Sequence, residues 1–410
     1  MTAAKRRILL VNHYAGSLVH GMEYRPFYLA REWVRLGHEV RIVGASFSHV
    51  RTRQPTQAAE THEGVAYQWL KTPAYRGNGA GRVRNIAAFC GRLALQASAL
   101  ATGFRPDVVI ASSTYPMDIW PARRIARLAG ARLVHEVHDL WPLSPVELGG
   151  MSPRHPFIRV CQAAEDYACR RADAVVSMLP KVHEHLASRG LDLRRLHIVP
   201  NGVLAGEWDA PGQALPPELA DHLAREKAAG RTVVTYAGAH GLANALGTLL
   251  DAAKLLAPQG GFSFVLVGDG PERDALGRRV ESEGIAHVRL FPPIGKAQIP
   301  TLLAATDVAY IGLQRVPIFR FGIAPNKLMD YMMAGCVVLN AIESGNDPVT
   351  ESGCGLTVAA ESPPAIVDGL VRLRVLPAAE RARMGAQGRA HILAHHTWPV
   401  LARRFLEAMG

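Results

Sequence analysis

The sequence predicts an α/β protein made of two doubly wound domains, each built on a mainly parallel sheet. Its 410 residues exceed what a single hydrophobic core usually holds. Short runs rich in Val, Ile and Leu alternate with helical patterns in the first half of the chain and again in the second. Such runs are typical of strands covered by helices on both faces. The turn residues Pro200-Asn201-Gly202 and the Pro- and Gly-richer stretch up to Pro217 mark the expected hinge.

Each half supplies its own set of expected strands. In the first half they cover residues 8–12, 40–44, 108–112, 133–138, 174–178 and 197–199. In the second half they cover residues 233–238, 264–268, 288–291, 308–312, 337–341 and 355–358. The clearest helices between them cover residues 23–36, 243–256 and 272–283. We therefore place the first domain at residues 1–202, the second at 203–392, and a C-terminal helix at 393–410 that crosses back to the first domain.

Composition indicates a globular protein that does not cross a membrane. Apolar residues make up 49% of the chain and charged residues 20%. The longest apolar run, residues 93–104, is shorter than the roughly 18 residues that a membrane span needs. The cysteines are odd in number and form no Cys-x-x-Cys, so we expect buried thiols rather than disulfides or a zinc site. The expected location is cytoplasmic, with attachment to the inner face of the cell membrane as an option.

The basic excess of the chain belongs to its first half. The net charge is +11, and residues 1–200 hold 27 Lys and Arg against 15 Asp and Glu. Such asymmetry favours an anionic partner for that half, namely nucleic acid, lipid headgroups or a phosphorylated substrate. A scattered basic surface without a partner is the alternative.

Loops that follow the expected strands carry the candidate site, because ligands of open parallel sheets lie beyond the carboxyl ends of the strands. In the first half, Gly21 precedes the expected helix and would let the backbone approach an anion closely, although an ordinary loop is equally consistent. His138 and Asp139 end a strand and are catalytic candidates, with a core histidine as the alternative. His135 and His138 are not a metal pair, because side chains three apart on a strand point to opposite faces.

The second half contains two further glycine-containing loops that follow expected strands. Gly238, His240 and Asn244 lie at a strand-to-helix turn that could cradle a phosphate, and so does Gly270 in the segment Gly268-Asp269-Gly270. Many parallel α/β proteins use such turns only structurally.

The segment "PNKLMDYMMAG" predicts a buried helix with an anion site at its start. Pro325 suits the first helical position, and Ala324 is then a poor cap. The amides of residues 326–328 have no partner within the helix, so with Lys327 they form a positive end. Asp330, one turn later, could accept hydrogen bonds from sugar hydroxyls, and a nucleoside diphosphate fits both features. The alternative is a core helix in which Asp330 is bonded to backbone.

Three motifs are absent from the sequence. No Asp-x-Asp occurs, which disfavours a metal-bridged diphosphate. No Gly-x-x-x-x-Gly-Lys-Ser/Thr and no Gly-x-Ser-x-Gly occur, which disfavours a nucleotide hydrolase and an α/β-hydrolase.

At these residues the chain resembles the retaining GT-B glycosyltransferases of family 4, over nearly its full length. The resemblance is carried by "HGMEYRPFYLAREWVRLGHEV", "HEVHDLWP", "HIVPNGV", "TYAGAHGLANALGTLLDAAKLL", "LVGDGPERDAL" and "FRFGIAPNKLMDYMMAG". It implies two Rossmann-like domains that face each other across a cleft. It also implies that the last of these helices receives the donor diphosphate, that Asp330 holds the ribose, that His138 lies beside the transferred sugar, and that Gly21 belongs to the first phosphate loop.

Two positions depart from the family pattern. In the family a second acidic residue usually lies eight positions before the acidic residue that holds the ribose, and here Gly322 takes that place. The loop at residues 238–244 lacks the family's Arg and Lys. Lys327 is therefore expected to carry more of the charge neutralisation, with help from His240, Asn244, Arg315 or Arg320.

The expected function is that of a retaining, metal-independent glycosyltransferase. It would move a sugar from a nucleotide-sugar, expected to be a UDP-sugar, to a polyprenyl-diphosphate-linked or other saccharide acceptor in surface polysaccharide biosynthesis, as in the family branch that handles amino- or deoxysugars. No cofactor, metal or nucleic acid is expected, and an anionic membrane surface is a further expected partner. Two alternatives remain, a UDP-sugar 2-epimerase of the same fold and a non-catalytic nucleotide-sugar-binding module. The expected catalytic residues are His138, Asp139 and Lys327, and the expected donor-binding residues are Gly21, Gly238, His240, Asn244, Gly270, Ile294, Asn326, Lys327, Leu328 and Asp330.

The basic first half predicts salt-sensitive membrane binding. Each suitably placed Lys or Arg contributes about 1 kcal/mol of attraction to anionic lipid, screened over about 8 Å at physiological salt. The protein should therefore float with anionic vesicles at low salt and lose that binding as salt rises. It should not bind vesicles of neutral lipid. Absence of flotation at low salt would favour a soluble acceptor.

Overall fold

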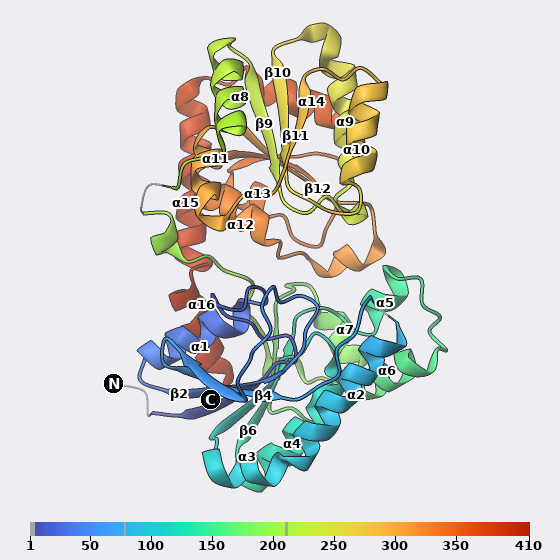
Figure 1. Cartoon of the computed structure of the whole chain (residues 1–410), viewed down its shortest axis with the longest axis vertical. Helices are drawn as coiled ribbons and strands as arrows, with labels where there is room; N and C mark the ends of the chain where they lie inside the picture. Colours follow the sequence, from blue (N-terminus) through green and yellow to red (C-terminus); the bar gives the residue numbers. More distant parts are fainter. Residues whose placement is uncertain (1–4, 78, 210–211) are drawn as a thin grey trace. The chain divides into compact units, whose positions relative to one another are not determined.

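The computed structural model describes residues 5–77, 79–209 and 212–410. It consists of two compact units, the first formed by residues 1–201 together with 398–410 and the second by residues 202–397 (Figure 1). Both units are α/β with parallel sheets, so the predicted fold class is confirmed. The chain passes from the first unit to the second at Asn201, beside the expected boundary at residue 202, and returns after Thr397.

Unit 1 contains an eight-stranded sheet with the order β3-β4-β2-β1-β5-β6-β7-β8. Its strands are parallel except for the antiparallel hairpin of β3 and β4 at one edge. The register aligns Val11 of β1 with Ala111 of β5, and Ala111 with His135 of β6, so the residues that follow meet at one edge. The strands are β1 (Arg7–Val11), β2 (Glu39–Ala45), β3 (Ala59–His62), β4 (Val65–Leu70), β5 (Val108–Ala111), β6 (Arg132–Val137), β7 (Ala174–Ser177) and β8 (Leu196–Ile198).

Helices cover both faces of this sheet (Figure 1). The C-terminal helix packs on α1, where the indole Nε1 of Trp33 donates to the carbonyl of Ala402 at 3.1 Å and the ring of Trp33 contacts Phe405. The helices are α1 (Arg25–Arg35), α2 (Ala80–Leu95), α3 (Ala97–Phe104), α4 (Ile119–Ala129), α5 (Leu143–Glu147), α6 (Pro156–Arg171), α7 (His183–Ser188) and α16 (Trp398–Ala408).

Unit 2 contains a six-stranded parallel sheet with the order β11-β10-β9-β12-β13-β14. Ala237 of β9 is aligned with Val267 of β10, so the loops that begin at Gly238 and Gly268 leave the sheet side by side. The strands are β9 (Thr232–Ala237), β10 (Phe262–Val267), β11 (Val288–Phe291), β12 (Val308–Gly312), β13 (Val337–Ala341) and β14 (Gly355–Thr357). The helices are α8 (Pro217–Ala228), α9 (Leu246–Leu256), α10 (Arg273–Ser282), α11 (Ile299–Ala304), α12 (Asn326–Met333), α13 (Pro348–Ser352), α14 (Pro363–Arg374) and α15 (Ala378–His395).

Three of the differences between the structure and the sequence prediction have a clear physical cause. The hairpin of β3 and β4 was not predicted, because β3 is short, polar and at the sheet edge, so it has no apolar run. Helix α12 begins at Asn326, one residue later than predicted, because Pro325 keeps an extended ψ of 127° and is itself the cap residue. The last helix begins at Trp398 rather than at residue 393, since residues 393–395 belong to α15.

No single helix among the described residues is long and apolar enough to span a membrane. Helices α2 and α3 pass such a test together by length and composition, but they are bent by 52° at the break. Both helices contribute side chains to the unit 1 core, among them Phe89, Leu93 and Phe104.

Candidate functional site

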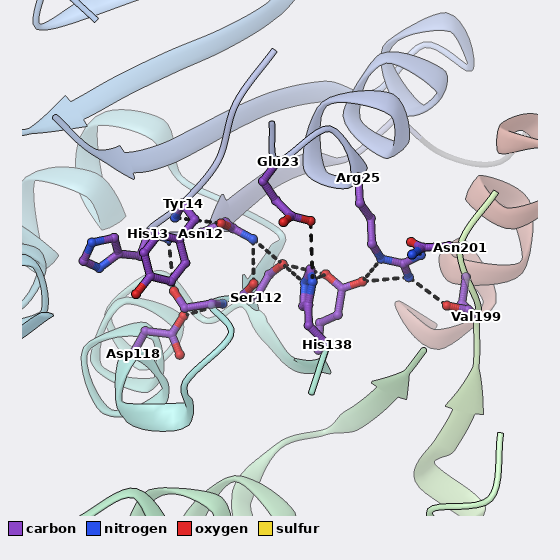
Figure 2. Close-up of polar contacts among 12 residues, drawn as sticks. Asn12, His13, Tyr14, Glu23, Arg25, Ser112, Asp118, His138, Val199 and Asn201 are labelled. Atoms are coloured by element: carbon purple, nitrogen blue, oxygen red, sulfur yellow. Dashed lines mark hydrogen bonds and ion pairs between the residues drawn. The ribbon is translucent and has the colours of Figure 1, made fainter. Parts of the chain in front are cut away.

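The first group of site residues lies where β1, β5 and β6 of unit 1 end. Because the three strands are in register, Asn12, Ser112 and Glu136 are neighbours at this edge (Figure 2). Glu136 and His138 are two residues apart in an extended segment, so they point to the same side. The sequence therefore gathers an amide, a hydroxyl, a carboxylate and an imidazole at one edge of the sheet.

Hydrogen bonds hold His138 from one side. Its Nε2 lies 3.0 Å from the hydroxyl of Ser112 and 3.3 Å from Oε2 of Glu136. The Ser112 hydroxyl also donates to Glu136 at 2.6 Å, and the Asn12 amide donates to the Ser112 carbonyl at 2.6 Å. The other imidazole nitrogen, Nδ1, faces Glu23 at 4.0 Å. The ring is thus fixed through Nε2, while Nδ1 is turned toward the loop before α1 (Figure 2).

Arg25 neutralises the buried carboxylate of Glu136. The two residues are 3% and 1% exposed, and Nε of Arg25 donates to Oε1 of Glu136 at 2.9 Å. The remaining guanidinium nitrogens donate to the carbonyls of Val199 and Pro200 at 2.8 and 2.6 Å. A buried ion pair is stable only when its other donors are satisfied, and Arg25 meets this condition.

The charges in this group shift each other's proton affinity. Burial alone would raise the pKa of Glu136, but Arg25 and His138 together lower it to about 2. Burial disfavours the imidazolium of His138, yet the Glu136 carboxylate outweighs burial and raises the pKa of His138 above its ordinary value. The group therefore consists of an ionised Glu136 between the guanidinium of Arg25 and the imidazole of His138.

Two other predicted residues of unit 1 lie outside this hydrogen-bonded group. Asp139 follows His138 directly, but its side chain is exposed and forms no hydrogen bond with His138 among the described residues. Gly21 has φ +80°, and a Cβ there would lie 2.5 Å from Oγ1 of Thr52, so a structural reason for glycine exists at this position.

The second group of site residues lies in unit 2, at the start of α12. The Leu328 amide donates to the Pro325 carbonyl at 3.1 Å, whereas the amides of Asn326 and Lys327 lie beyond any acceptor within the helix. The helix is anchored by Tyr331, whose hydroxyl accepts from the amide of Ala237 at 2.8 Å. This anchor ties the positive end of α12 to the carboxyl end of β9.

Lys327 is held over the loop that follows β9. Its Nζ donates to the hydroxyl of Tyr236 at 2.8 Å and to Oδ1 of Asn244 at 2.5 Å, and it lies 4.6 Å from the centre of the Tyr236 ring. A Cβ at Gly238 would lie 3.3 Å from Cε of Lys327, so glycine makes room for this side chain. Burial lowers the pKa of Lys327 to about 8. No carboxylate among the described residues forms an ion pair with this ammonium group.

Asp330 lies half-buried one turn further along α12. Burial raises its pKa to about 7, and Lys296 lowers it while Glu207 raises it further. Lys296 is itself paired with Glu207 at 2.6 Å, so much of its charge is already compensated. Among residues 5–77, 79–209 and 212–410 no donor forms a hydrogen bond with the Asp330 carboxylate. The carboxylate therefore has capacity for donors from outside the chain.

The other predicted residues of unit 2 have different surroundings. His240 is fully buried with both ring nitrogens unbonded among the described residues, and its backbone bonds to Asp269 and Glu272 lock the loop of Gly270 in place. Leu328 and Ile294 pack in the core of the unit, and Asn326 is exposed. Arg315 and Arg320 line a cavity of about 510 Å³, where Arg315 pairs with Glu343 at 2.8 Å.

Sequence reasoning missed Glu136, Ser112 and Arg25 in unit 1 and Tyr236 in unit 2. Glu136 could have been found, because strand alternation places it on the same side as His138. The contributions of Arg25 and Tyr236 depend on which segments the fold brings together, so no local sequence pattern predicts them.

Removal of the Glu136 charge should lower the pKa of His138. In the Glu136→Gln variant burial is no longer outweighed, so the imidazole titrates at lower pH than in the wild type. NMR titration of the His138 ring measures this shift directly. Glu165→Gln is the matched control, because Glu165 is also buried and pairs with a different histidine, His185, at 2.7 Å. An unchanged His138 pKa in Glu136→Gln would contradict the charge network.

Two family models match the chain. A "Glycosyl transferase 4-like domain" matches residues 20–202 and "Glycosyl transferases group 1" matches residues 231–374. No sequence among curated proteins matches.

Solved structures show the same fold over the whole chain. Sucrose-phosphate synthase from Thermosynechococcus elongatus is 15% identical with a TM-score of 0.76, and the match covers 98% of each chain. Anabaena HepE in complex with UDP-glucose is 14% identical with a TM-score of 0.65 and the same coverage. WaaG, a glycosyltransferase involved in lipopolysaccharide biosynthesis, is 13% identical with a TM-score of 0.65 and the same coverage.

These matches decide between the classes that the sequence left open. Both family models are those of transferases, so neither the 2-epimerase nor the non-catalytic module is retained. The chain carries a glycosyl transferase 4-like domain followed by a glycosyl transferases group 1 domain, and it is a glycosyltransferase of the GT-B fold.

Proposed function

We propose that this enzyme transfers a sugar from a UDP-sugar to a saccharide acceptor with retention of configuration and without a metal ion. The observation that carries the proposal is Lys327, whose half-buried ammonium group has no carboxylate partner among the described residues and is held at the positive end of α12. Such a group favours an anionic ligand, because burial has already removed part of its hydration. A nucleotide diphosphate supplies the matching charge.

The diphosphate would lie against Lys327 and the first amides of α12. Cleavage of the bond between sugar and phosphate places additional negative charge on the leaving diphosphate. Fixed amides and an ammonium group stabilise that charge more in the transition state than in the ground state, which is the condition for a faster reaction. Tyr236 and Asn244 act as positioning residues, because they hold Nζ of Lys327 and need not touch the donor.

The ribose of the donor would bind to Asp330. Its carboxylate has room for external donors, and it lies one turn along the same helix as Lys327. The ribose ring and the diphosphate of one nucleotide are joined through the C5′ methylene, so neighbouring sites on one helix suit both. The choice of uridine is supported by HepE, which is a structure in complex with UDP-glucose.

The transferred sugar would be contacted by His138 of unit 1. Glu136 and Ser112 occupy Nε2, so Nδ1 is the nitrogen that remains for the substrate. The raised pKa of His138 favours a protonated ring that donates a hydrogen bond. In the front-side displacement that retention implies, the leaving phosphate would take the proton of the acceptor hydroxyl, and Asp139 is the nearest exposed carboxylate in sequence that could bind the acceptor.

A lipid-linked acceptor fits the charge of the first half of the chain. Residues 1–200 carry the basic excess, and a polyprenyl-diphosphate saccharide presents both phosphate and a membrane surface. The fold similarity to WaaG, which is involved in lipopolysaccharide biosynthesis, agrees with this class of acceptor. We accordingly place the enzyme in surface polysaccharide biosynthesis at the inner face of the cell membrane.

Two substitutions should separate the ribose contact from the diphosphate contact. Loss of a hydrogen bond to a charged group costs about 1.5–3 kcal/mol, or about 10- to 100-fold in binding. Asp330→Asn should weaken uridine and UDP equally, whereas Lys327→Met should weaken UDP and leave uridine nearly unchanged. Calorimetry with both ligands measures the difference.

The pH dependence gives the same experiment a second readout. Because Asp330 titrates near 7 and must be ionised to accept ribose hydroxyls, UDP affinity should rise as pH increases through 7. Because Lys327 titrates near 8 and must be protonated, affinity should fall above 8. Asp330→Asn should remove the rise and Lys327→Met the fall. Asp368→Asn, at an exposed ion pair on α14, is the control and should change neither. Unchanged UDP affinity in both site variants would refute the donor site.

His138→Ala should slow turnover without weakening nucleotide binding. The side chain is proposed to contact only the sugar, so kcat should fall far more than UDP affinity. Added Mn²⁺ should restore nothing and should leave the wild-type rate unchanged, because the donor diphosphate is neutralised by Lys327. Comparable loss of UDP affinity would show instead that His138 shapes the nucleotide pocket.

A further inference from the structure

A cluster of potential metal ligands lies in unit 1, away from the hydrogen-bonded group around His138. It consists of His20, Glu60 and His62. Glu60 and His62 are two residues apart on β3, so strand alternation puts both side chains on the same face. His20 comes from the loop between β1 and α1, the loop that also contains Gly21 and Glu23. Two imidazoles and one carboxylate are thus contributed by two separate segments.

The ligand atoms already have the spacing of a metal site. Nε2 of His20 lies 3.0 Å from Oε1 of Glu60, and Nε2 of His62 lies 3.1 Å from Oε2 of the same residue. All ligand atoms of the cluster lie within 4.8 Å of one another. Bonds of about 2.0–2.1 Å to a tetrahedral zinc ion place ligand atoms about 3.3 Å apart, so side-chain rotations that draw the two imidazole nitrogens toward one carboxylate oxygen would complete the site.

The hydrogen bonds around the cluster leave a nitrogen facing its centre. Nε2 of His62 is buried and forms no hydrogen bond among the described residues, although a Glu60 oxygen is only 3.1 Å away. Nδ1 of His20 is 2.8 Å from the hydroxyl of Ser17, so that ring is held from behind and its Nε2 points to Glu60. Trp69 donates to Oε1 of Glu60 at 2.5 Å and orients the carboxylate. Supporting contacts of this kind orient the ligands of natural zinc sites.

The cluster is largely buried but not closed to solvent. The His20 side chain is 3% exposed, and the side chains of Glu60 and His62 are 18% and 22% exposed. The partial exposure of Glu60 and His62 leaves a path for an ion and for a water molecule.

We propose that His20, Glu60 and His62 bind a zinc ion, with water as the fourth ligand, and that this ion fastens the loop carrying Gly21 to the hairpin of β3 and β4. Two histidines, one carboxylate and water form a known ligand set for zinc. None of the three ligands belongs to the groups around His138 or Lys327.

The ion would add to contacts that already hold the loop. The Tyr67 hydroxyl donates to the Gly16 carbonyl at 2.9 Å, and the Thr52 amide donates to the His20 carbonyl at 3.1 Å. The loop therefore keeps its path without the metal, and the expected consequence of zinc is a higher unfolding temperature.

Zinc titration of the full-length protein after chelator treatment tests the proposal. A chromophoric chelator competes for Zn²⁺, and the wild type should take up one tight equivalent per chain that raises Tm. Glu60→Gln, which keeps the shape and the contact with Trp69, should lose that equivalent and the rise in Tm. His62→Ala should do the same, and because His62 lies on an edge strand its unliganded fold should be retained. Cobalt(II) spectra of the wild type should show the intense visible bands of a tetrahedral site.

The chain offers a matched control for surface binding of zinc. His391 and His395 lie one helical turn apart on α15, with ring centres 5.0 Å apart, and could chelate a metal weakly. The His395→Ala variant should still bind one equivalent of Zn²⁺ tightly and still show the zinc-induced rise in Tm. If His395→Ala loses the tight equivalent, or Glu60→Gln and His62→Ala both retain it, the site is not the one proposed. A wild type that binds no zinc tightly also overturns the proposal, whereas the donor site is judged by UDP binding alone.

Discussion

The half-buried ammonium group of Lys327 at the start of α12 is the feature on which the proposed donor site depends. Lys327 can occupy this position because Tyr236 and Asn244 accept hydrogen bonds from its ammonium group and because Gly238 leaves room for its side chain. Tyr331 fixes the helix to the end of β9, so the backbone that carries Lys327 stays beside the loop that follows this strand. The cost of burying this charge in the free enzyme is the reason that it favours a polyanionic ligand.

Unit 1 uses the opposite arrangement, a buried anion that lies between Arg25 and His138. Glu136 orders both Arg25 and His138, and through Arg25 it also binds the carbonyls at Val199 and Pro200, where the chain leaves the unit. Loss of Arg25 or of Glu136 would leave the other as an uncompensated buried charge, which typically costs about 3–5 kcal/mol. One acidic residue thus couples the orientation of the candidate catalytic imidazole to the end of the first domain.

The fold was predictable because its strands are continuous apolar runs between clear helices. The expected strands at residues 288–291, 308–312 and 337–341 have the observed bounds of β11, β12 and β13. The hairpin of β3 and β4 escaped prediction because an edge strand that alternates exposed and half-buried residues has no apolar signature. Likewise, Pro325 was assigned to the helix from its φ preference, but its extended ψ makes it the cap.

The candidate site was predictable where a motif is local and not where it is assembled by the fold. Lys327 and Asp330 stand out because a cation and an acid interrupt an apolar helix. The partners that give these residues their properties, Tyr236 and Asn244 for Lys327, come from a segment about eighty residues earlier. The zinc ligands are a similar case, since His20 approaches Glu60 and His62 only after the loop folds over the hairpin.

The central claim is that Lys327 contacts the donor diphosphate, and its own titration tests this most directly. The chain has few lysines, so NMR of protein labelled at lysine Cε can follow each one, with the Lys327→Met variant assigning the signal. Without ligand the Lys327 pKa should be near 8. With UDP bound it should rise clearly, because a neighbouring anion favours the ammonium form, and uridine should produce no such rise. A Lys327 pKa that is the same with and without UDP would contradict the account.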